Sequence, residues 1–217
     1  MLRLTFGSRN GSPRKVLCLG AHADDIEIGA GGAILRLCDQ YDDLEVFWVV
    51  FAASGPRGAE ARKSASVFLK KAYRKTVVVK SFRDGFFPFQ GARIKEYFED
   101  LKESFDPDVI LTHNRSDLHQ DHRFISEATW NTFRDHFILE YEIVKYDGDL
   151  GSPNFFVGLD AETCRKKIGA IMTCFKTQNN RKWFTEETFL SILKLRGIES
   201  SAKDAYAEGY YCRKMAF

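Results

Sequence analysis

The 217-residue sequence predicts an α/β fold in which helices flank a mostly parallel sheet. Short apolar runs without polar alternation recur between residues 15 and 112, and such runs are typical of strands buried on both faces. Segments with helical periodicity separate the runs, so strand and helix alternate about four times, as in a parallel sheet with helical crossovers. With 44% hydrophobic and 29% charged residues, the chain can build one ordinary globular core.

Four strand–helix pairs are expected in the N-terminal part of the chain. The run 46–53 shows the strand signal most clearly, and it is far shorter than the ~20 apolar residues that span a bilayer. A polar, glycine-containing turn is predicted at 54–58, and Asp106 and Pro107 end the third helix. The strands are predicted at 15–20, 46–53, 76–80 and 109–112, and the helices at 28–40, 59–71, 91–105 and 119–134.

Beyond Ile138 the alternation is looser but continues the same architecture. Neither an internal repeat nor a linker separates this region, so residues 1–217 are predicted to form a single Rossmann-like domain. Residues 1–13 are interpreted as a loose lead-in. The additional C-terminal elements are expected to be strands at 139–146, 154–159 and 206–213 and helices at 161–175 and 186–195.

Charge and cysteine content narrow the choice of partners and compartment. The chain has 32 Lys and Arg against 30 Asp and Glu, a net charge of +2, which provides no drive toward nucleic acid. We expect no membrane span. The five cysteines are odd in number, contain no Cys-x-x-Cys motif and follow no secretory leader, so we expect free thiols in the cytoplasm. The sequence leaves the oligomeric state open and allows a homo-oligomer.

Two polar clusters follow the first and fourth predicted strands and contain four of the five histidines. In open α/β sheets, ligands bind beyond the carboxyl ends of the strands, so both clusters are expected at a ligand site. The first cluster, at 21–27, contributes His22, Asp24 and Asp25, and the second, at 113–122, contributes His119, Asp121 and His122.

Imidazole and carboxylate side chains at this spacing indicate a metal centre. The pair His22 and Asp25 and the pair His119 and His122 are each three residues apart at a strand-to-helix junction, so each pair can converge on one point. Such ligands suit Zn²⁺ or Fe²⁺, and the two clusters together supply three ligands with an open position for water. The alternative for the first cluster is an Asp N-cap with a histidine nearby by chance.

The two clusters resemble the signatures of a known family. Ala21-His22-Ala23-Asp24-Asp25, followed by Gly29, Gly31 and Gly32, resembles the A-H-P-D-D signature of the PIG-L/LmbE-like de-N-acetylases, with Ala23 in place of the usual proline. His119-Gln120-Asp121-His122 resembles the family's second signature, H-x-D-H. Leu118 stands where some thiol-pathway members have arginine, so the resemblance does not transfer their substrate.

The resemblance implies a zinc-dependent hydrolase that removes an acetyl group from a small N-acetylated amino sugar. It implies that His22, Asp25 and His122 bind the zinc ion and that Asp24 is the general base. It also implies that His119 stabilises the transition state or acts as the acid, oriented by Asp121. Amide cleavage needs a proton donor for the amine, and either Asp24 or His119 can serve.

Residues beside the clusters are candidates for contact with substrate. Arg57, Asn114 and Asp117 lie in loops at the same edge of the predicted sheet. Arg57 is equally well explained as a solvated loop residue, and Asp117 as a residue that positions its loop. His113, at the end of its strand, either faces the site or is a structural histidine.

Two rival functions remain open. The first is a non-haem ferrous oxygenase, which uses two histidines and one carboxylate. Asp24 argues against it, because dioxygen chemistry has no evident use for an extra base beside the metal. The second is a catalytically silent metal-binding or sugar-binding protein, which the intact set Asp24, His119 and His122 disfavours.

Overall fold

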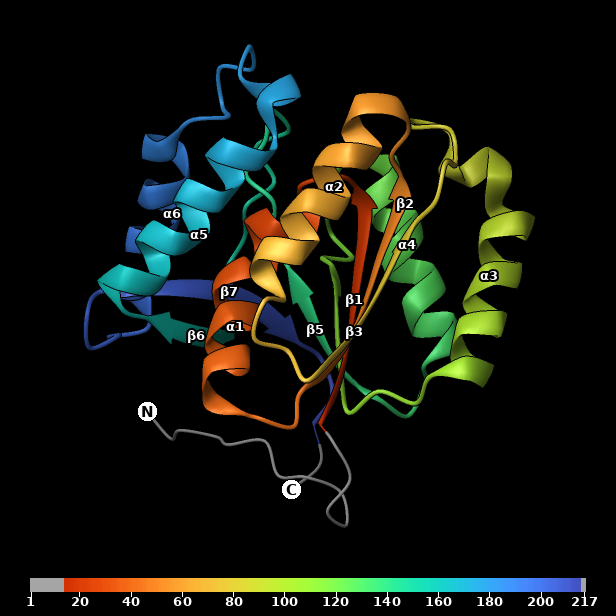
Figure 1. The fold of residues 1–217 in the computed structure, drawn as a ribbon, viewed down its shortest axis with the longest axis horizontal. Coiled ribbons are helices and arrows are strands. Elements are labelled where there is room, and N and C mark those ends of the chain that lie inside the picture. The colour runs from red at the N-terminus through yellow and green to blue at the C-terminus, as the bar shows by residue number, and fades with distance from the viewer. Residues whose placement is uncertain (1–13, 216–217) are drawn as a thin grey trace.

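A seven-stranded sheet lies between two layers of helices in the computed structural model, which describes residues 14–215 (Figure 1). The strand order is β3-β2-β1-β4-β5-β7-β6. The first five strands pair in parallel, whereas β7 is antiparallel to both of its neighbours. The strands are β1 (Lys15–His22), β2 (Glu45–Ala52), β3 (Arg74–Val79), β4 (Val109–His113), β5 (Phe137–Tyr141), β6 (Phe155–Leu159) and β7 (Tyr206–Cys212).

Two apolar cores hold the helices against the two faces of the sheet. On one face, α1, α2, α5 and α6 bury side chains such as Ile26, Phe68 and Ile171. On the other face, α3 and α4 bury side chains such as Phe98 and Ile125. The helices are α1 (Asp25–Gln40), α2 (Gly55–Phe68), α3 (Gly91–Ser104), α4 (Gln120–Thr132), α5 (Ala161–Cys174) and α6 (Glu186–Glu199), with short 3-10 helices η1 (Phe87–Gln90) and η2 (Lys176–Gln178).

The predicted α/β class with a mostly parallel sheet and added C-terminal elements is confirmed. The turn predicted at 54–58 is wrong, because α2 already begins at Gly55. Pro56 occupies its first turn, where a missing N–H costs no helical hydrogen bond. The strand predicted at 139–146 ends at Tyr141. The lead-in at 1–13 lies outside the described residues, and the single-domain organisation stays a prediction.

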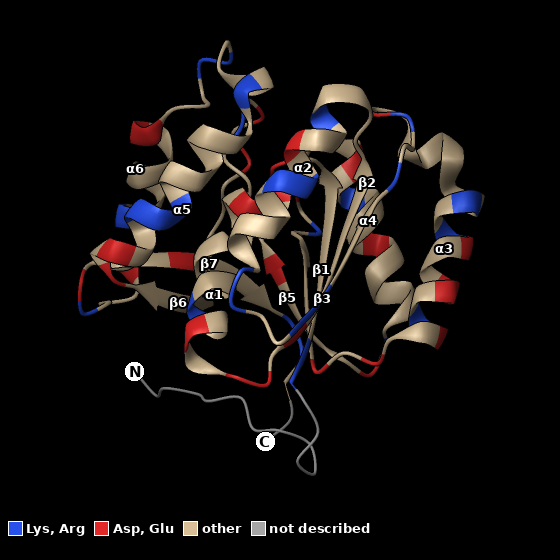
Figure 2. Cartoon of the chain, viewed as in Figure 1, with Lys and Arg blue, Asp and Glu red and all other residues tan. Residues whose placement is uncertain are grey.

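Charged residues and cysteines agree with the sequence-based expectations where the structure describes them. In the view of Figure 2, acidic and basic segments are interspersed over the helices and form no continuous basic stripe. All five cysteines are free thiols. Within residues 14–215, none of the helices combines the length and apolar character that crossing a membrane requires.

The centre of the sheet is where a ligand site is expected. β1 and β4 are neighbours, and their following helices α1 and α4 lie on opposite faces of the sheet. The strand order reverses between them, and in open α/β sheets ligands bind at the carboxyl ends of the strands at such a switch point. His22 is the last residue of β1 and His113 is the last residue of β4, so both polar clusters start at this switch point.

Glycines let α1 approach the sheet very closely. A Cβ atom at Gly29 would overlap the ring of Tyr141, and one at Gly31 would lie 2.6 Å from the Phe68 ring. Gly29 thus lets α1 approach the sheet, and Gly31 lets it approach α2. Since α1 carries Asp25 at its first position, its depth against the sheet helps to determine where that carboxylate lies.

Candidate active site

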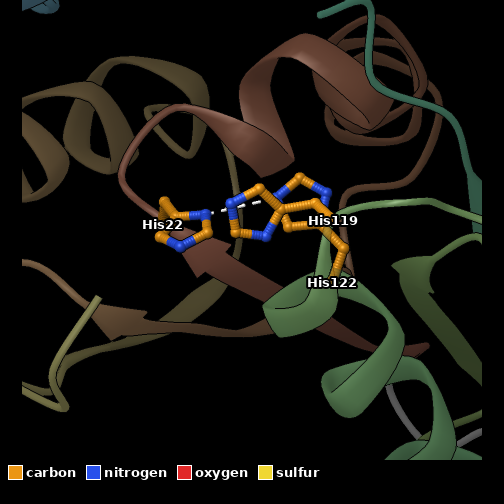
Figure 3. Close-up of side chains that lie close together, drawn as sticks. All are labelled: His22, His119 and His122. Carbon is orange, nitrogen blue, oxygen red and sulfur yellow. Dashed lines mark hydrogen bonds between the residues drawn. The ribbon is translucent and has the colours of Figure 1, made fainter. Parts of the chain in front are cut away.

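The two polar clusters meet at the carboxyl ends of β1 and β4, where the imidazoles of His22 and His122 face one another (Figure 3). The Nδ1 atom of His22 lies 3.2 Å from the Nε2 atom of His122. The Oδ2 atom of Asp25 lies 3.4 Å from His22 Nδ1 and 3.5 Å from His122 Nε2. Three ligands at about 2.1 Å from a tetrahedral ion are separated by about 3.4 Å. The three side chains therefore fit one zinc-sized cation.

Carboxylates hold the outer nitrogens of both histidines. His122 Nδ1 lies 2.9 Å from Asp117 Oδ2, and His22 Nε2 lies 3.3 Å from Asp121 Oδ2 and 3.0 Å from Asp84 Oδ1. A carboxylate on one ring nitrogen fixes the tautomer and leaves the other nitrogen for a metal. Burial, helped by His113, lowers the pKa of His122 to about 4, so this ring is neutral, as a ligand must be.

Negative charge is concentrated around the cluster. Burial opposes the charged form of His22, but its contacts with Asp121, Asp25 and Asp84 prevail and raise its pKa well above the usual value. Five carboxylates surround the two histidines, and two basic side chains pair with them: Asp24, Asp25, Asp84, Asp117 and Asp121 against Arg57 and Lys145. Imidazoles among surplus carboxylates form a donor set that suits a divalent cation.

Asp24 precedes the metal cluster in a strained conformation. Its φ of 99° lies in the left-handed region, which is unfavourable for a residue with a side chain. Its carboxylate is 4% exposed, and Oδ1 accepts a hydrogen bond of 3.0 Å from Arg57. Burial, opposed by Arg57 and reinforced by Asp25, raises the pKa of Asp24 to about 7. A buried acid with a pKa near 7 suits a general base at neutral pH.

The resemblance implied that Asp121 orients His119, but the carboxylate of Asp121 bonds to other groups. Its oxygens accept hydrogen bonds from the backbone N–H groups of Gly85 (2.6 Å) and Phe87 (3.1 Å), besides contacting His22. The backbone N–H of Asp121 instead donates to His119 Nδ1 over 3.2 Å, because His119 is the N-cap of α4. In this bond Nδ1 is the acceptor, so the neutral form of His119 has its hydrogen on Nε2.

Asp117 and Asn114 were expected as candidate substrate contacts, but their side chains are bonded to other groups of the protein. Asp117 is 2% exposed, and its carboxylate contacts His122, the backbone N–H of His119 and Lys145. Asn114 is buried, and its side-chain oxygen accepts from the Ser116 backbone over 3.0 Å. Both residues therefore shape the loop after β4, as the alternative for Asp117 anticipated.

Arg57 and His113 lie close to the cluster. The Arg57 guanidinium donates to the Ala23 carbonyl as well as to Asp24, and the side chain remains 26% exposed. Its contact with substrate stays a prediction. His113 is fully buried, with Nε2 at 2.9 Å from the backbone nitrogen of Ala21 and 3.2 Å from Asp25 Oδ2. Together with Asp25 and His122 it also offers atoms within 4.8 Å of one another that could hold a metal ion.

Asp84 is a site residue that the sequence interpretation missed. It lies in the loop between β3 and η1 and reaches His22, although its side chain is 76% exposed. The available signal was an acidic residue followed by glycine just after the third predicted strand, at the same edge of the sheet as the other clusters.

A family model described as PIG-L, GlcNAc-PI de-N-acetylase, matches residues 17–133, which include both polar clusters and more than half of the chain. The chain belongs to this family. The family resemblance expected from the two signatures is thereby confirmed. Comparison with curated proteins gives no match.

Solved structures share the fold of this PIG-L family chain. N,N'-diacetylchitobiose deacetylase from Pyrococcus horikoshii is 21% identical, with a TM-score of 0.72 over 91% of this chain and 82% of that chain. The zinc-inhibited form of teicoplanin deacetylase Orf2 is 14% identical, with a TM-score of 0.69 over 91% and 97%. GalB, the 4-carboxy-2-hydroxymuconate hydratase from Pseudomonas putida KT2440, is 16% identical, with a TM-score of 0.75 over 94% and 98%. At these identities the likeness shows the fold alone, and the same fold serves deacetylases and a hydratase.

Proposed function

We propose that this PIG-L family protein is a zinc-dependent hydrolase that removes the acetyl group from a small N-acetylated amino sugar. The observation that carries the proposal is the convergence of His22, Asp25 and His122, whose facing atoms are 3.2–3.5 Å apart, beside the buried acid Asp24. The family's description as a de-N-acetylase and the deacetylases among the similar structures support this choice of reaction.

A zinc ion held by these three residues would supply Lewis-acid activation of a water molecule and of the amide carbonyl. Asp24 is adjacent in sequence to the ligand Asp25, and its pKa of about 7 allows it to accept the proton of the attacking water. The same acid can then return that proton to the amine as the C–N bond breaks. One proton is taken and one is delivered, so the step balances as amide plus water giving acetic acid and amine, which at neutral pH are present as acetate and the protonated amine.

In the proposed reaction His119 stabilises the carbonyl oxygen as negative charge develops on it. In support, one of its ring nitrogens lies within 4.8 Å of a ring nitrogen of His22 and of His122. Burial and the neighbouring His22 lower the pKa of His119, so the neutral ring donates a hydrogen bond through Nε2 while Nδ1 caps α4. Asp24, with its higher affinity for a proton, is therefore the better general acid.

The test is acetate release by the purified, zinc-loaded protein from a panel of N-acetylated amino sugars, with mass spectrometry of each sugar. Loss of one acetyl group by the wild type, and none by Asp24→Asn, is the expected result. The matched control is Asp39→Asn, because Asp39 lies at the end of α1 and pairs with Lys71 at the surface. Oxygen consumption without acetate release would favour the ferrous oxygenase. Metal or sugar binding without turnover would favour the catalytically silent protein.

A further inference from the structure

A buried ion pair from the C-terminal part of the chain contacts the backbone of α1 close to the candidate site. Lys167 of α5 and Glu208 of β7 are 2% and 3% exposed, and Lys167 Nζ lies 2.6 Å from Glu208 Oε1. Both residues lie outside the segment that the family model matches, which ends at residue 133. The proposed reaction uses neither side chain.

The ion pair engages backbone groups in the middle of α1. Lys167 donates to the Ile28 carbonyl over 2.6 Å, and Glu208 accepts from the backbone N–H groups of Gly32 (2.6 Å) and Ala33 (2.7 Å). In a regular α-helix the N–H of residue 32 bonds the carbonyl of residue 28. Here the Ile28 carbonyl also accepts from Lys167, and the Gly32 N–H also donates to Glu208, so the ion pair contacts α1 at this turn.

The glycine at position 32 makes this contact possible. A Cβ atom at Gly32 would lie 2.8 Å from Glu208 Oε1, so no larger residue leaves room for the carboxylate. Tyr210 completes the arrangement by donating to Glu208 Oε2 over 2.7 Å. The carboxylate thus has four donors, two from α1, one from α5 and one from its own strand.

Ile28 connects the ion pair to the site. Its carbonyl accepts from Lys167, while its N–H donates to the carbonyl of Asp24 over 2.9 Å. Asp24 and Asp25, which the proposed function uses as base and ligand, therefore lie one helical turn from the point where the ion pair contacts α1. A rigid turn of helix transmits an axial shift to both carboxylates, and shifts of 0.5–1 Å are enough to weaken a metal site.

Stability alone does not account for such a pair. Removing two charges from water costs several kcal/mol per ion, and apolar replacements of similar volume are often neutral or stabilising. Buried ionic groups are best known for setting the register between elements. A pair that bonds to three backbone groups of one helix is suited to that role.

We propose that Lys167 and Glu208 are positioning residues that set the depth and axial position of α1, and so the placement of Asp24 and Asp25 relative to His22 and His122. The inference deepens the proposed function, but its main test is the affinity for zinc, which does not depend on the identity of the substrate.

The main variant is Lys167→Met/Glu208→Leu, which replaces both charges by apolar side chains of similar volume. We expect it to unfold at a temperature similar to that of the wild type, because the buried charges are removed together. Its affinity for Zn²⁺ should fall about ten-fold, the lower end of the range seen when a residue that bonds to a metal ligand is replaced. Competition with a chromophoric chelator, well below the unfolding temperature, measures this affinity. Hydrogen exchange at Gly32 and Ala33 should accelerate.

Arg196 and Glu142 supply the matched control. They form another buried pair, with N–O distances of 2.6 and 2.7 Å, and within residues 14–215 neither side chain is hydrogen-bonded to α1. The variant Arg196→Met/Glu142→Leu should therefore keep the wild-type zinc affinity.

Glu208→Gln is the second variant and keeps the proposal testable if the double variant does not fold. Its amide offers one oxygen in place of two, so it cannot accept from all four donors, and its zinc affinity should lie between those of the wild type and the double variant. Wild-type zinc affinity in every folded variant would overturn the proposal, as would an equal loss in the Arg196 and Glu142 control. Absence of deacetylation in the wild type would overturn the proposed function but would leave this comparison of zinc affinities intact.

Discussion

The β1–α1 and β4–α4 junctions occupy equivalent places on either side of the topological switch point, yet they contribute different chemistry. The first junction supplies His22 and Asp25, two of the proposed ligands, and Asp24, a strained, buried acid at a positive φ. The second supplies His122, the third proposed ligand, and His119, an N-cap in an ordinary extended conformation. The proposed base is thus at the strained junction.

The two junctions are also held by different means. The helix α1 is anchored by glycine contacts with Tyr141 and by the ion pair of Lys167 and Glu208. The helix α4 is anchored through Asp121, whose carboxylate binds the loop at Gly85. The depth of α1 therefore depends on the C-terminal part of the chain, whereas the start of α4 is tied to the loop before η1.

Replacing the acid at the strained junction should produce the largest effect. Asp24→Asn removes the base and keeps the shape, so kcat for acetate release should fall by about 10²–10⁴-fold while zinc remains bound. Steady-state kinetics with elemental analysis of the same preparation checks both parts. If kcat is unchanged, Asp24 is not the base and the contrast between the junctions fails.

Replacing Asp117, whose carboxylate contacts His122 at the β4–α4 junction, should affect zinc binding and turnover differently. Asp117→Asn weakens the orientation of His122, so the affinity for Zn²⁺ should fall about 10–100-fold, with activity recovering as zinc is added in excess. Asp106→Asn is the control, because Asp106 contacts His136 at 3.0 Å, away from the site. Equal zinc affinities of the two variants would contradict the role given to Asp117.

Overpacking α1 should give the smallest effect and should appear mainly in stability. Gly29→Ala places a methyl group into the ring of Tyr141 and should lower the free energy of unfolding by about 1–3 kcal/mol. Gly169→Ala in α5 meets no atom within 4 Å and should be neutral or stabilising by about 0.5–1 kcal/mol. Urea unfolding of both variants checks the difference, and a stable Gly29→Ala would show that α1 is not held at a fixed depth.

Much of the fold and the residues of the metal centre could be predicted from the sequence, because their signals are local. Apolar runs predicted the parallel strands. The polar clusters at the strand ends indicated His22, Asp25 and His122, whose facing atoms lie within reach of one ion. The partners of these residues were harder to predict. Which histidine Asp121 contacts is decided by the tertiary approach of the loop at Gly85, a separation of 36 residues.

Long-range contacts explain the other misses. The pairing of Arg57 with Asp24 needs α2 to start early enough to turn the guanidinium toward α1, and the sequence predicted a turn there. The contact of Lys167 with Ile28 joins residues 139 positions apart, and neither residue has a local pattern that indicates it.

The most direct test of the central claim is a crystal structure of the zinc-loaded protein with anomalous data at the zinc edge. We predict one strong peak about 2.0–2.2 Å from His22 Nδ1, Asp25 Oδ2 and His122 Nε2. A peak among His22 Nε2, Asp84 and Asp121, which also lie within 4.8 Å of one another, would contradict it, as would the absence of any peak at the carboxyl ends of β1 and β4.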